Sequence, residues 1–190
     1  MSFQRLMTRA LRTLSVLGVL SGGVFVTGCG YALAGRGSAL PASVRTIGIP
    51  MFTNRTSVFN LETTLTTKVR AEFIGRGKYV IVPTASNVDS VLTGEVTSVS
   101  IVPSAFNAQQ LASRYAITMT ARVELKNSKD EAVLWENPAL VFRQEFDATG
   151  TQSAAGAVDP TTFFGQDTNA LDRLSGEFAR SIVSAILEAF

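Results

Sequence analysis

The clearest hydrophobic pattern in the sequence is an alternation between residues 115 and 125. Its odd-numbered positions carry Tyr115, Ile117, Met119, Ala121, Val123 and Leu125, and the even-numbered ones are mostly polar. A period of two is typical of a β-strand that buries one face and exposes the other. We therefore predict a long strand here, a hairpin turn at 127–130 and a returning strand over 132–146. Pro138 should bend or break the returning strand, because proline has no backbone N–H to donate.

Two other segments have the spacing of amphipathic helices. From about 60 to 74, apolar side chains recur every four residues at Leu61, Leu65, Val69 and Phe73. Asn60 stands where a helix cap is expected, and Gly75 and Gly77 follow the last turn. A second helix is predicted from about residue 169 to residue 190. Its apolar stripe is expected at Leu171, Leu174, Phe178, Ile182, Ala185 and Ala189.

Three further β-rich segments lie at 44–50, 78–82 and 90–102, and Gly94 marks an expected β-bulge in the last of them. The first two flank the helix at 60–74, so they should be parallel and either adjacent or one strand apart. Segments 103–113 and 147–165 are interpreted as loops. We therefore predict an α+β fold for a single domain at 44–190. It is a two-layer α/β sandwich with two helices packed on one face of a mixed sheet of about four strands.

The first 28 residues have the organisation of a secretory signal. Arg5, Arg9 and Arg12 precede an apolar run at 14–26, and small residues follow that run. A transmembrane helix needs about 20 apolar residues, so this shorter run is a poor permanent span. We predict a signal peptide at 1–28 and a tether at 29–43, which is rich in glycine, alanine and serine.

The end of this signal resembles the lipobox of bacterial lipoproteins, in the residues Val26-Thr27-Gly28-Cys29. The resemblance implies transfer of diacylglycerol to the Cys29 sulfur, cleavage after Gly28 and acylation of the new amino group. Cys29 is the one cysteine in the sequence, so an intramolecular disulfide cannot form. Gly30 stands where an aspartate would resemble an inner-membrane retention signal. We therefore expect a lipid-anchored protein of the outer membrane that faces the periplasm.

Charge and composition exclude several functions. Removing the signal takes away three of the 17 basic residues and leaves 14 against 15 acidic ones, which gives no basic surface for nucleic acid. The sequence has no histidine, which excludes histidine-dependent catalytic triads and the usual zinc sites. Carboxylate pairs remain among Glu136, Glu145 and Asp147, but such residues are usually just solvated. We predict no enzymatic activity, no cofactor and no bound metal.

The polar face of the strand at 115–125 is the candidate interaction site. It presents Thr118, Thr120 and Arg122, with Arg114 and Lys126 at its ends, so two or three cations are expected near one edge. Such a row could contact a polar barrel lumen or the phosphates of a glycolipid, or it could be a solvated sheet face. Apolar contacts or core edges are expected at Ile101, Val102, Phe106, Phe163 and Phe164.

Several segments together resemble the LptE family of outer-membrane lipoproteins. The likeness begins at Cys29-Gly30-Tyr31 and Leu40-Pro41, and continues through 44–50, Leu61-Glu62, 72–77, 91–96, 114–123, 141–146 and the last helix. It implies a two-layer domain that plugs an LptD-type β-barrel, supports its assembly and engages lipopolysaccharide. The basic residues that enteric members carry are missing near Asn107 and Gly165, which are their places in this chain.

A second resemblance points to another class of partner. The segment 47–56, Ile-Gly-Ile-Pro-Met-Phe-Thr-Asn-Arg-Thr, is similar to the opening strand and loop of other lipoproteins. Some of these activate peptidoglycan synthases, and others build secretion pores. This alternative implies binding to an enzyme or self-association.

Overall fold

The computed structural model describes residues 40–148 and 157–190 of the 190-residue chain. The signal, Cys29 and most of the tether therefore lie outside the described residues. The described elements, in chain order, are β1 (Thr46–Gly48), β2 (Thr53–Asn54), α2 (Leu61–Gly75), β3 (Val80–Val82), β4 (Ser90–Phe106), β5 (Ala112–Asn127), β6 (Val133–Asp147), α3 (Pro160–Gln166) and α4 (Thr168–Glu188).

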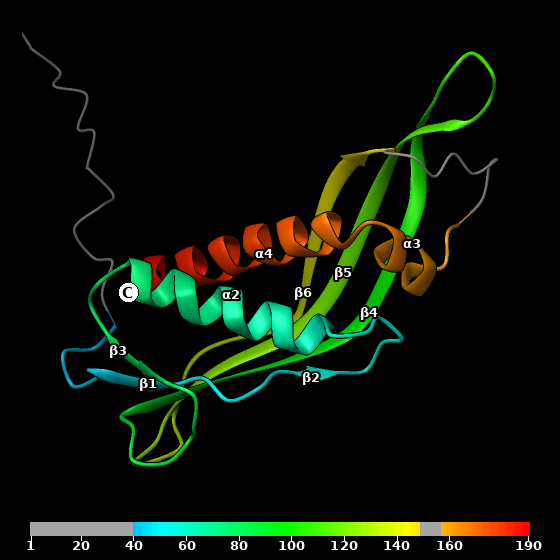
Figure 1. Ribbon diagram of the computed structural model, residues 1–190. Helices are drawn as coiled ribbons and strands as arrows, with labels where there is room; N and C mark the ends of the chain where they lie inside the picture. Colours follow the sequence, from blue (N-terminus) through cyan, green and yellow to red (C-terminus); the bar gives the residue numbers. More distant parts are fainter. Residues whose placement is uncertain (1–39, 149–156) are drawn as a thin grey trace, which may run out of the picture. The chain divides into compact units, whose positions relative to one another are not determined.

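These elements form two layers, with α2 and α4 side by side over one face of a mixed sheet (Figure 1). The sheet order is β3-β1-β4-β5-β6, with β2 pairing beside β4. β1 pairs in parallel with both β3 and β4, which confirms the parallel pairing predicted around the first helix. The α+β class is as predicted, but six of the described strands take part in the sheet rather than about four. The described part has three helices, and none of them has the length and apolar content required of a membrane span.

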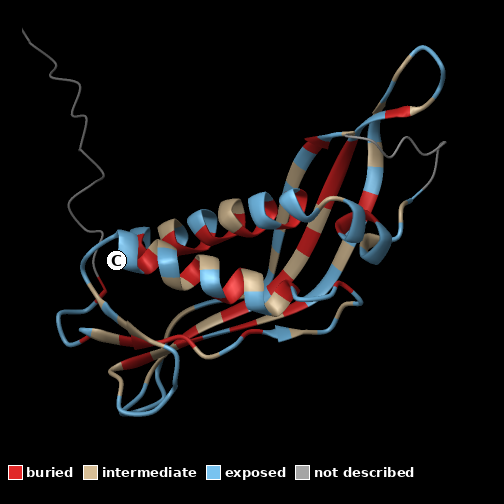
Figure 2. Cartoon of the chain, in the orientation of Figure 1, coloured by how far each residue is buried: buried red, intermediate tan, exposed pale blue. Residues whose placement is uncertain are grey.

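The core lies between the helices and the sheet (Figure 2). The α2 stripe is fully buried at all four predicted positions, and so is the odd-numbered face of β5. Met119 pairs with Val99 of β4 and Phe142 of β6, and the Phe142 ring contacts Phe178 of α4 edge-on at 5.8 Å between ring centres. The alternation in the sequence thus identifies the sheet face that receives the helices.

The β4–β6 meander differs from the sequence prediction in its bulges and its turn. The irregularities in β4 fall between Val96 and Ser98 and after Pro103, not at Gly94. A Cβ on Gly94 would lie 2.6 Å from the buried Phe52 ring, so the glycine permits a close approach. The expected loop 103–113 shrinks to 107–111, because both strands extend further.

Pro138 interrupts the ladder of β6, as predicted, without ending the strand. The pairing with β5 is shifted between Asn137 and Leu140, which places one extra residue in β6. The Asn137 side chain accepts a hydrogen bond from the backbone N–H of Ala139 at 3.2 Å. The bulge lies at the outer edge of the sheet, where a missing N–H costs little.

The structure corrects the predicted cap of α2 and the predicted start and apolar stripe of α4. Asn60 has a left-handed backbone (φ 60°) and makes no side-chain cap, while its carbonyl oxygen accepts from the N–H and hydroxyl of Thr64. α4 is capped by Asp167, whose carboxylate accepts from the N–H of Ala170 at 2.9 Å. The predicted stripe of α4 fails in its last turns, where Ala185 and Ala189 are exposed. Val183, Ile186 and Leu187 are buried there instead.

The segment predicted as a loop at 147–165 contains the short helix α3. Asp159 caps it by accepting from the N–H of Thr162 at 2.9 Å, and Pro160 occupies its first position. Phe163 and Phe164 are buried, so both belong to the core rather than to a contact surface. The Phe163 ring meets Tyr115 edge-on at 5.5 Å between ring centres. Residues 149–156 lie outside the described part.

Candidate interaction surface

The face of β4, β5 and β6 that points away from the helices carries the predicted polar row. Thr118, Thr120 and Arg122 all lie on this outer face of β5, the two threonines half-buried and the arginine exposed. Thr118 pairs with Ser100 and Arg143, and Thr120 with Ser98 and Val141. The Thr97 hydroxyl donates to the Thr120 carbonyl oxygen at 3.1 Å. The middle of the face is therefore a band of small hydroxyl and aliphatic groups, which we call the hydroxyl band (Thr97, Ser98, Ser100, Thr118, Thr120 and Val141).

The cations do not converge near one edge, which corrects the sequence prediction. Arg114 and Lys126 stand at opposite ends of β5, roughly 40 Å apart at about 3.3 Å per residue. Arg114 is paired with Glu145 at 3.5 Å and with Asp147 at 3.2 Å. Lys126 is paired with Glu124 at 2.9 Å, and the hydrogen bond and charge of Glu124 raise the pKa of the Lys126 ammonium above its ordinary value.

Two arginines flank the hydroxyl band without an ion pair. Across residues 40–148 and 157–190, no carboxylate lies within ion-pair distance of Arg122 or Arg143. Glu95, which pairs with Arg122 in the strand register, forms its ion pair with Arg55 at 2.7 Å instead. Sequence reasoning missed Arg143, because its position beside Thr118 depends on the register shift at Pro138.

The apolar candidates separate into core and surface. Ile101 is 1% exposed and belongs to the core, whereas Val102 and Phe106 are 38% and 47% exposed at the far end of β4. Phe106 pairs with Ala112 across the start of the turn at 107–111. The exposed Phe106 ring is therefore positioned at the tip of the β4–β5 hairpin.

The three carboxylates considered for catalysis do not come together as a group. Glu136, Glu145 and Asp147 lie on one strand, and Glu136 is about 30 Å along β6 from Glu145 and about 36 Å from Asp147 at about 3.3 Å per residue. Glu145 and Asp147 both contact Arg114. In the described part of the chain, no group of three metal-binding side chains comes together.

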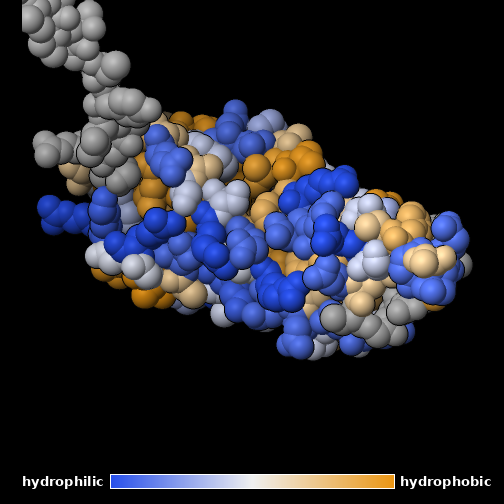
Figure 3. Space-filling model, turned by 90° about the horizontal axis from the view of Figure 1, so that it is seen from above, coloured by the Kyte–Doolittle hydropathy of each residue, from blue (hydrophilic) through white to orange (hydrophobic). Residues whose placement is uncertain are grey.

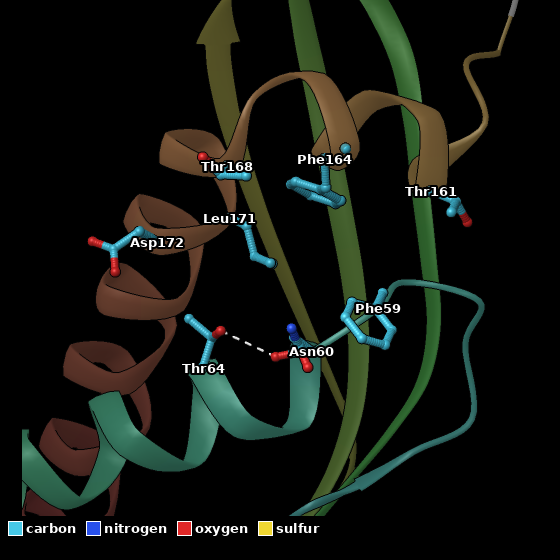
Figure 4. A pocket seen from close by; sticks show the side chains of 9 residues that line it. Phe59, Asn60, Thr64, Thr161, Phe164, Thr168, Leu171 and Asp172 are labelled. Carbon is cyan, nitrogen blue, oxygen red and sulfur yellow. Dashed lines mark hydrogen bonds between the residues drawn. The ribbon is translucent and has the colours of Figure 1, made fainter.

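A hollow of about 400 Å³ lies at the other side of the molecule, among the starts of α2 and α4 and the helix α3 (Figure 4). Phe59, Phe164 and Leu171 supply its apolar lining, while Asn60, Thr64, Thr161, Thr168 and Asp172 supply polar groups. The Asp172 carboxylate forms an ion pair with the Lys68 ammonium, at 2.7 Å between Oδ1 and Nζ. Sequence reasoning did not predict this hollow, because its walls come from segments about 100 residues apart.

These features define a class of protein: a small two-layer α+β domain with one sheet face left open. A family model confirms the resemblance noted in the sequence, so the chain belongs to the LptE family. The family model described as "LptE: Lipopolysaccharide-assembly" matches residues 44–186, which is most of the chain. None of the curated proteins compared with it by sequence matches the chain.

Solved structures with a similar arrangement share little sequence with this chain. The hypothetical protein CT253 of Chlamydia trachomatis is 11% identical over 77% of this chain and 99% of its own, with a TM-score of 0.49. The rare lipoprotein B of Shewanella oneidensis is 14% identical over 76% of this chain and 92% of its own, at 0.44. PelC, described as a dodecamer from Paraburkholderia phytofirmans, is 12% identical over 77% of this chain and 91% of its own, at 0.46. Because all three TM-scores are below 0.5, the family assignment depends on the family model and not on these structures.

Proposed function

We propose that this protein is an outer-membrane lipoprotein, acylated at Cys29, that plugs an LptD-type β-barrel and supports lipopolysaccharide assembly at the cell surface. The observation that carries the proposal is the family match over residues 44–186. The N-terminal signal and the lipobox sequence around Cys29 support the anchor. Three acyl chains would hold the protein in the membrane far more firmly than the marginal binding of one chain.

The open sheet face supports the plug role. A plug must present groups that tolerate water and that hydrogen-bond to a polar barrel wall. The hydroxyl band does this across three strands, because its side chains are short and most of them carry a hydroxyl group. Arg122 and Arg143 add guanidinium groups, which suit carboxylates or phosphates on the opposing surface. We propose Arg114, Thr118, Thr120, Arg122, Lys126 and Phe106 as contacts to the barrel or to lipopolysaccharide, with Arg143 added.

We further propose that the protein works by binding and not by catalysis. The sequence lacks histidine, and the carboxylates that could have formed an acid–base pair are about 30 Å apart or paired with Arg114. Nothing in this role calls for a cofactor or a metal ion.

The test is affinity purification of the tagged protein from detergent-solubilised outer membranes. Recovery of a β-barrel of transporter size supports the proposal, whereas recovery of a peptidoglycan synthase or of further copies of the chain itself supports the alternative class. Acyl groups on the first residue of the mature protein, measured by mass spectrometry, test the anchor in the same sample.

A pair of variants tests the sheet face. Thr118→Glu with Thr120→Glu places two charges on the hydroxyl band, and we expect barrel recovery to fall at least tenfold. Ser181→Glu is the matched control, because Ser181 is exposed on α4 in the helix layer. Equal recovery with both variants would show that the barrel contacts another face.

A further inference from the structure

The described chain begins at one end of the domain, beside the last turn of α2 and the short strand β3. Leu40 is buried there, and its N–H donates to the Tyr79 hydroxyl at 3.0 Å. The N–H of Val80 donates to the carbonyl oxygen of Arg45 at 2.9 Å. Arg76 reaches Ser184 near the end of α4 at 2.9 Å. These contacts place the chain entry, β3 and the ends of α2 and α4 together, and we call this region the entry end (Figure 1).

The entry end exposes large apolar side chains. Ile74, in the last turn of α2, is 60% exposed, and Val80, the first residue of β3, is 61% exposed. Phe190, just beyond α4, is 39% exposed. Seen from above, the surface is largely hydrophilic, with apolar groups in smaller patches (Figure 3). Three exposed apolar side chains thus lie on neighbouring elements at this end, which makes the entry end a candidate contact surface.

Long basic side chains share this end of the domain with the apolar groups. Arg45, Arg76 and Lys78 are all exposed at the entry end. Two of the neighbouring carboxylates are engaged within the domain. Glu72 pairs with Arg76 at 3.0 Å, and Asp89 accepts from the backbone N–H groups of Arg45 and Thr46. Glu188 is the third acid at this end. Aliphatic groups beside an exposed arginine such as Arg45 are typical of surfaces that lie at the boundary between lipid headgroups and acyl chains.

The chain that precedes Leu40 determines which surface can reach the membrane. Cys29 stands eleven residues ahead of Leu40, and an extended chain spans at most about 3.6 Å per residue. A lipidated Cys29 would therefore keep Leu40 within about 40 Å of the headgroups. The tip of the β4–β5 hairpin lies far from Leu40, because Ser90 at the start of β4 pairs with β1 and the tip follows Phe106 at the other end.

We propose that the entry end lies on the phospholipid surface of the membrane that holds the anchor. Ile74 and Val80 reach the headgroup–acyl boundary, and the Arg45 guanidinium extends to the lipid phosphates. The proposal rests on the lipidation of Cys29 proposed above. The tether raises the local concentration of bilayer around this end, so weak contacts are sufficient to orient the domain.

The test labels single cysteines in the full lipidated protein. A cysteine introduced by Ile74→Cys or Val80→Cys is the one free thiol, because lipid occupies the sulfur of Cys29. Each variant carries an environment-sensitive fluorophore and is reconstituted in vesicles of phosphatidylethanolamine and phosphatidylglycerol. We expect the emission at positions 74 and 80 to shift to the blue and to be quenched by bilayer quenchers. Ala108→Cys, at the hairpin tip, is the control and should stay water-exposed.

Mass spectrometry of the same samples separates the two proposals. Acylated protein whose labels at 74 and 80 remain water-exposed would overturn the membrane contact alone. Protein without acyl groups would overturn the anchor and this inference with it. A second variant checks the basic group: Arg45→Glu should at least halve the blue shift at position 80, and an unchanged shift would remove this cation from the contact.

Discussion

The Asp89 side chain, which directly precedes β4, binds the start of the neighbouring strand β1. Its Oδ2 accepts from the backbone N–H groups of Arg45 and Thr46, both at 3.0 Å, and from the Thr46 hydroxyl at 2.9 Å. The Asp89 N–H in turn donates to the Thr46 hydroxyl. This exchange fixes the start of β1 beside the start of β4. The N–H of Arg45 is the largest cause of the lowered pKa of Asp89, followed by the two groups of Thr46.

The lowered pKa of Asp89 predicts a pH-dependent contribution to stability. The unfolded state binds the proton more tightly than the folded state, so the contribution is full above the unfolded pKa of about 3.8 and is lost as the pH falls below it. Asp89→Asn keeps an acceptor but removes the charge. We expect the variant to be less stable than wild type at pH 7, and the difference to shrink toward pH 3. Urea unfolding at several pH values measures this, and a constant difference would contradict it.

At the scale of elements, β5 organises the domain because it is the central strand of the antiparallel meander and presents both functional faces. Its odd-numbered residues form the floor of the core, and its even-numbered residues form the open face. A shift of one residue in register would exchange these faces. The edge strand β6 tolerates Pro138 and a bulge, whereas β5 contains neither proline nor glycine.

The two faces of β5 predict opposite responses to a charge. Met119→Asp places an unpaired carboxylate at a fully buried position, and we expect a loss of about 4 kcal/mol or more, enough to unfold many domains. Thr118→Asp places the same group on the outer face beside Arg143, and we expect a change within about 1 kcal/mol. Chemical denaturation followed by circular dichroism compares them. Equal losses would mean that both faces of β5 are packed.

At the scale of the whole molecule, α3 closes the end of the core that α2 and α4 leave open. Phe163 contacts Tyr115 and Phe164 edge-on, at 5.5 and 5.4 Å between ring centres. Val158, just before α3, forms an isolated bridge with Ile101 of β4. Arg173 of α4 stacks over the Phe146 ring of β6 at 4.6 Å. These contacts join the C-terminal helices to the base of the projecting hairpin.

This packing predicts that two phenylalanines near the hairpin differ in their effect on stability. Phe163→Ala removes a ring that is 6% exposed, and we expect a loss of about 3 kcal/mol from lost burial and the remaining cavity. Phe106→Ala removes a ring that is 47% exposed, and we expect a loss below about 0.5 kcal/mol. Thermal and urea unfolding compare the two variants. A large loss for Phe106→Ala would place that ring in the core and remove it from the proposed contacts.

The sequence predicted those parts of the fold that depend on local periodicity. The four-residue spacing of Leu61 and its successors defined α2, and the alternation from Tyr115 to Leu125 defined β5 with the correct face. It did not predict α3, because Phe163 and Phe164 stand in a short segment whose burial depends on Tyr115, nearly 50 residues earlier. In the candidate site, the position of Thr118, Thr120 and Arg122 on one face could be predicted from the alternation along β5. Arg143 was missed, because its place beside Thr118 follows from strand pairing.

Local backbone geometry explains what the sequence determined by itself. Helix and strand periods of 3.6 and 2.0 residues act within a few positions, so α2, α4, the longer strands and the buried face of β5 could be inferred from side-chain spacing. The parallel pairing of β1 and β3 could be inferred because these strands flank α2 in the sequence. Contacts between distant residues decided the rest. The packing of elements decided which ion pairs engage Arg114 and Lys126 and how deeply Phe163 is buried. It also brought Ile74, Val80 and Phe190 to one end of the domain. The spacing of residues along the chain does not encode these contacts.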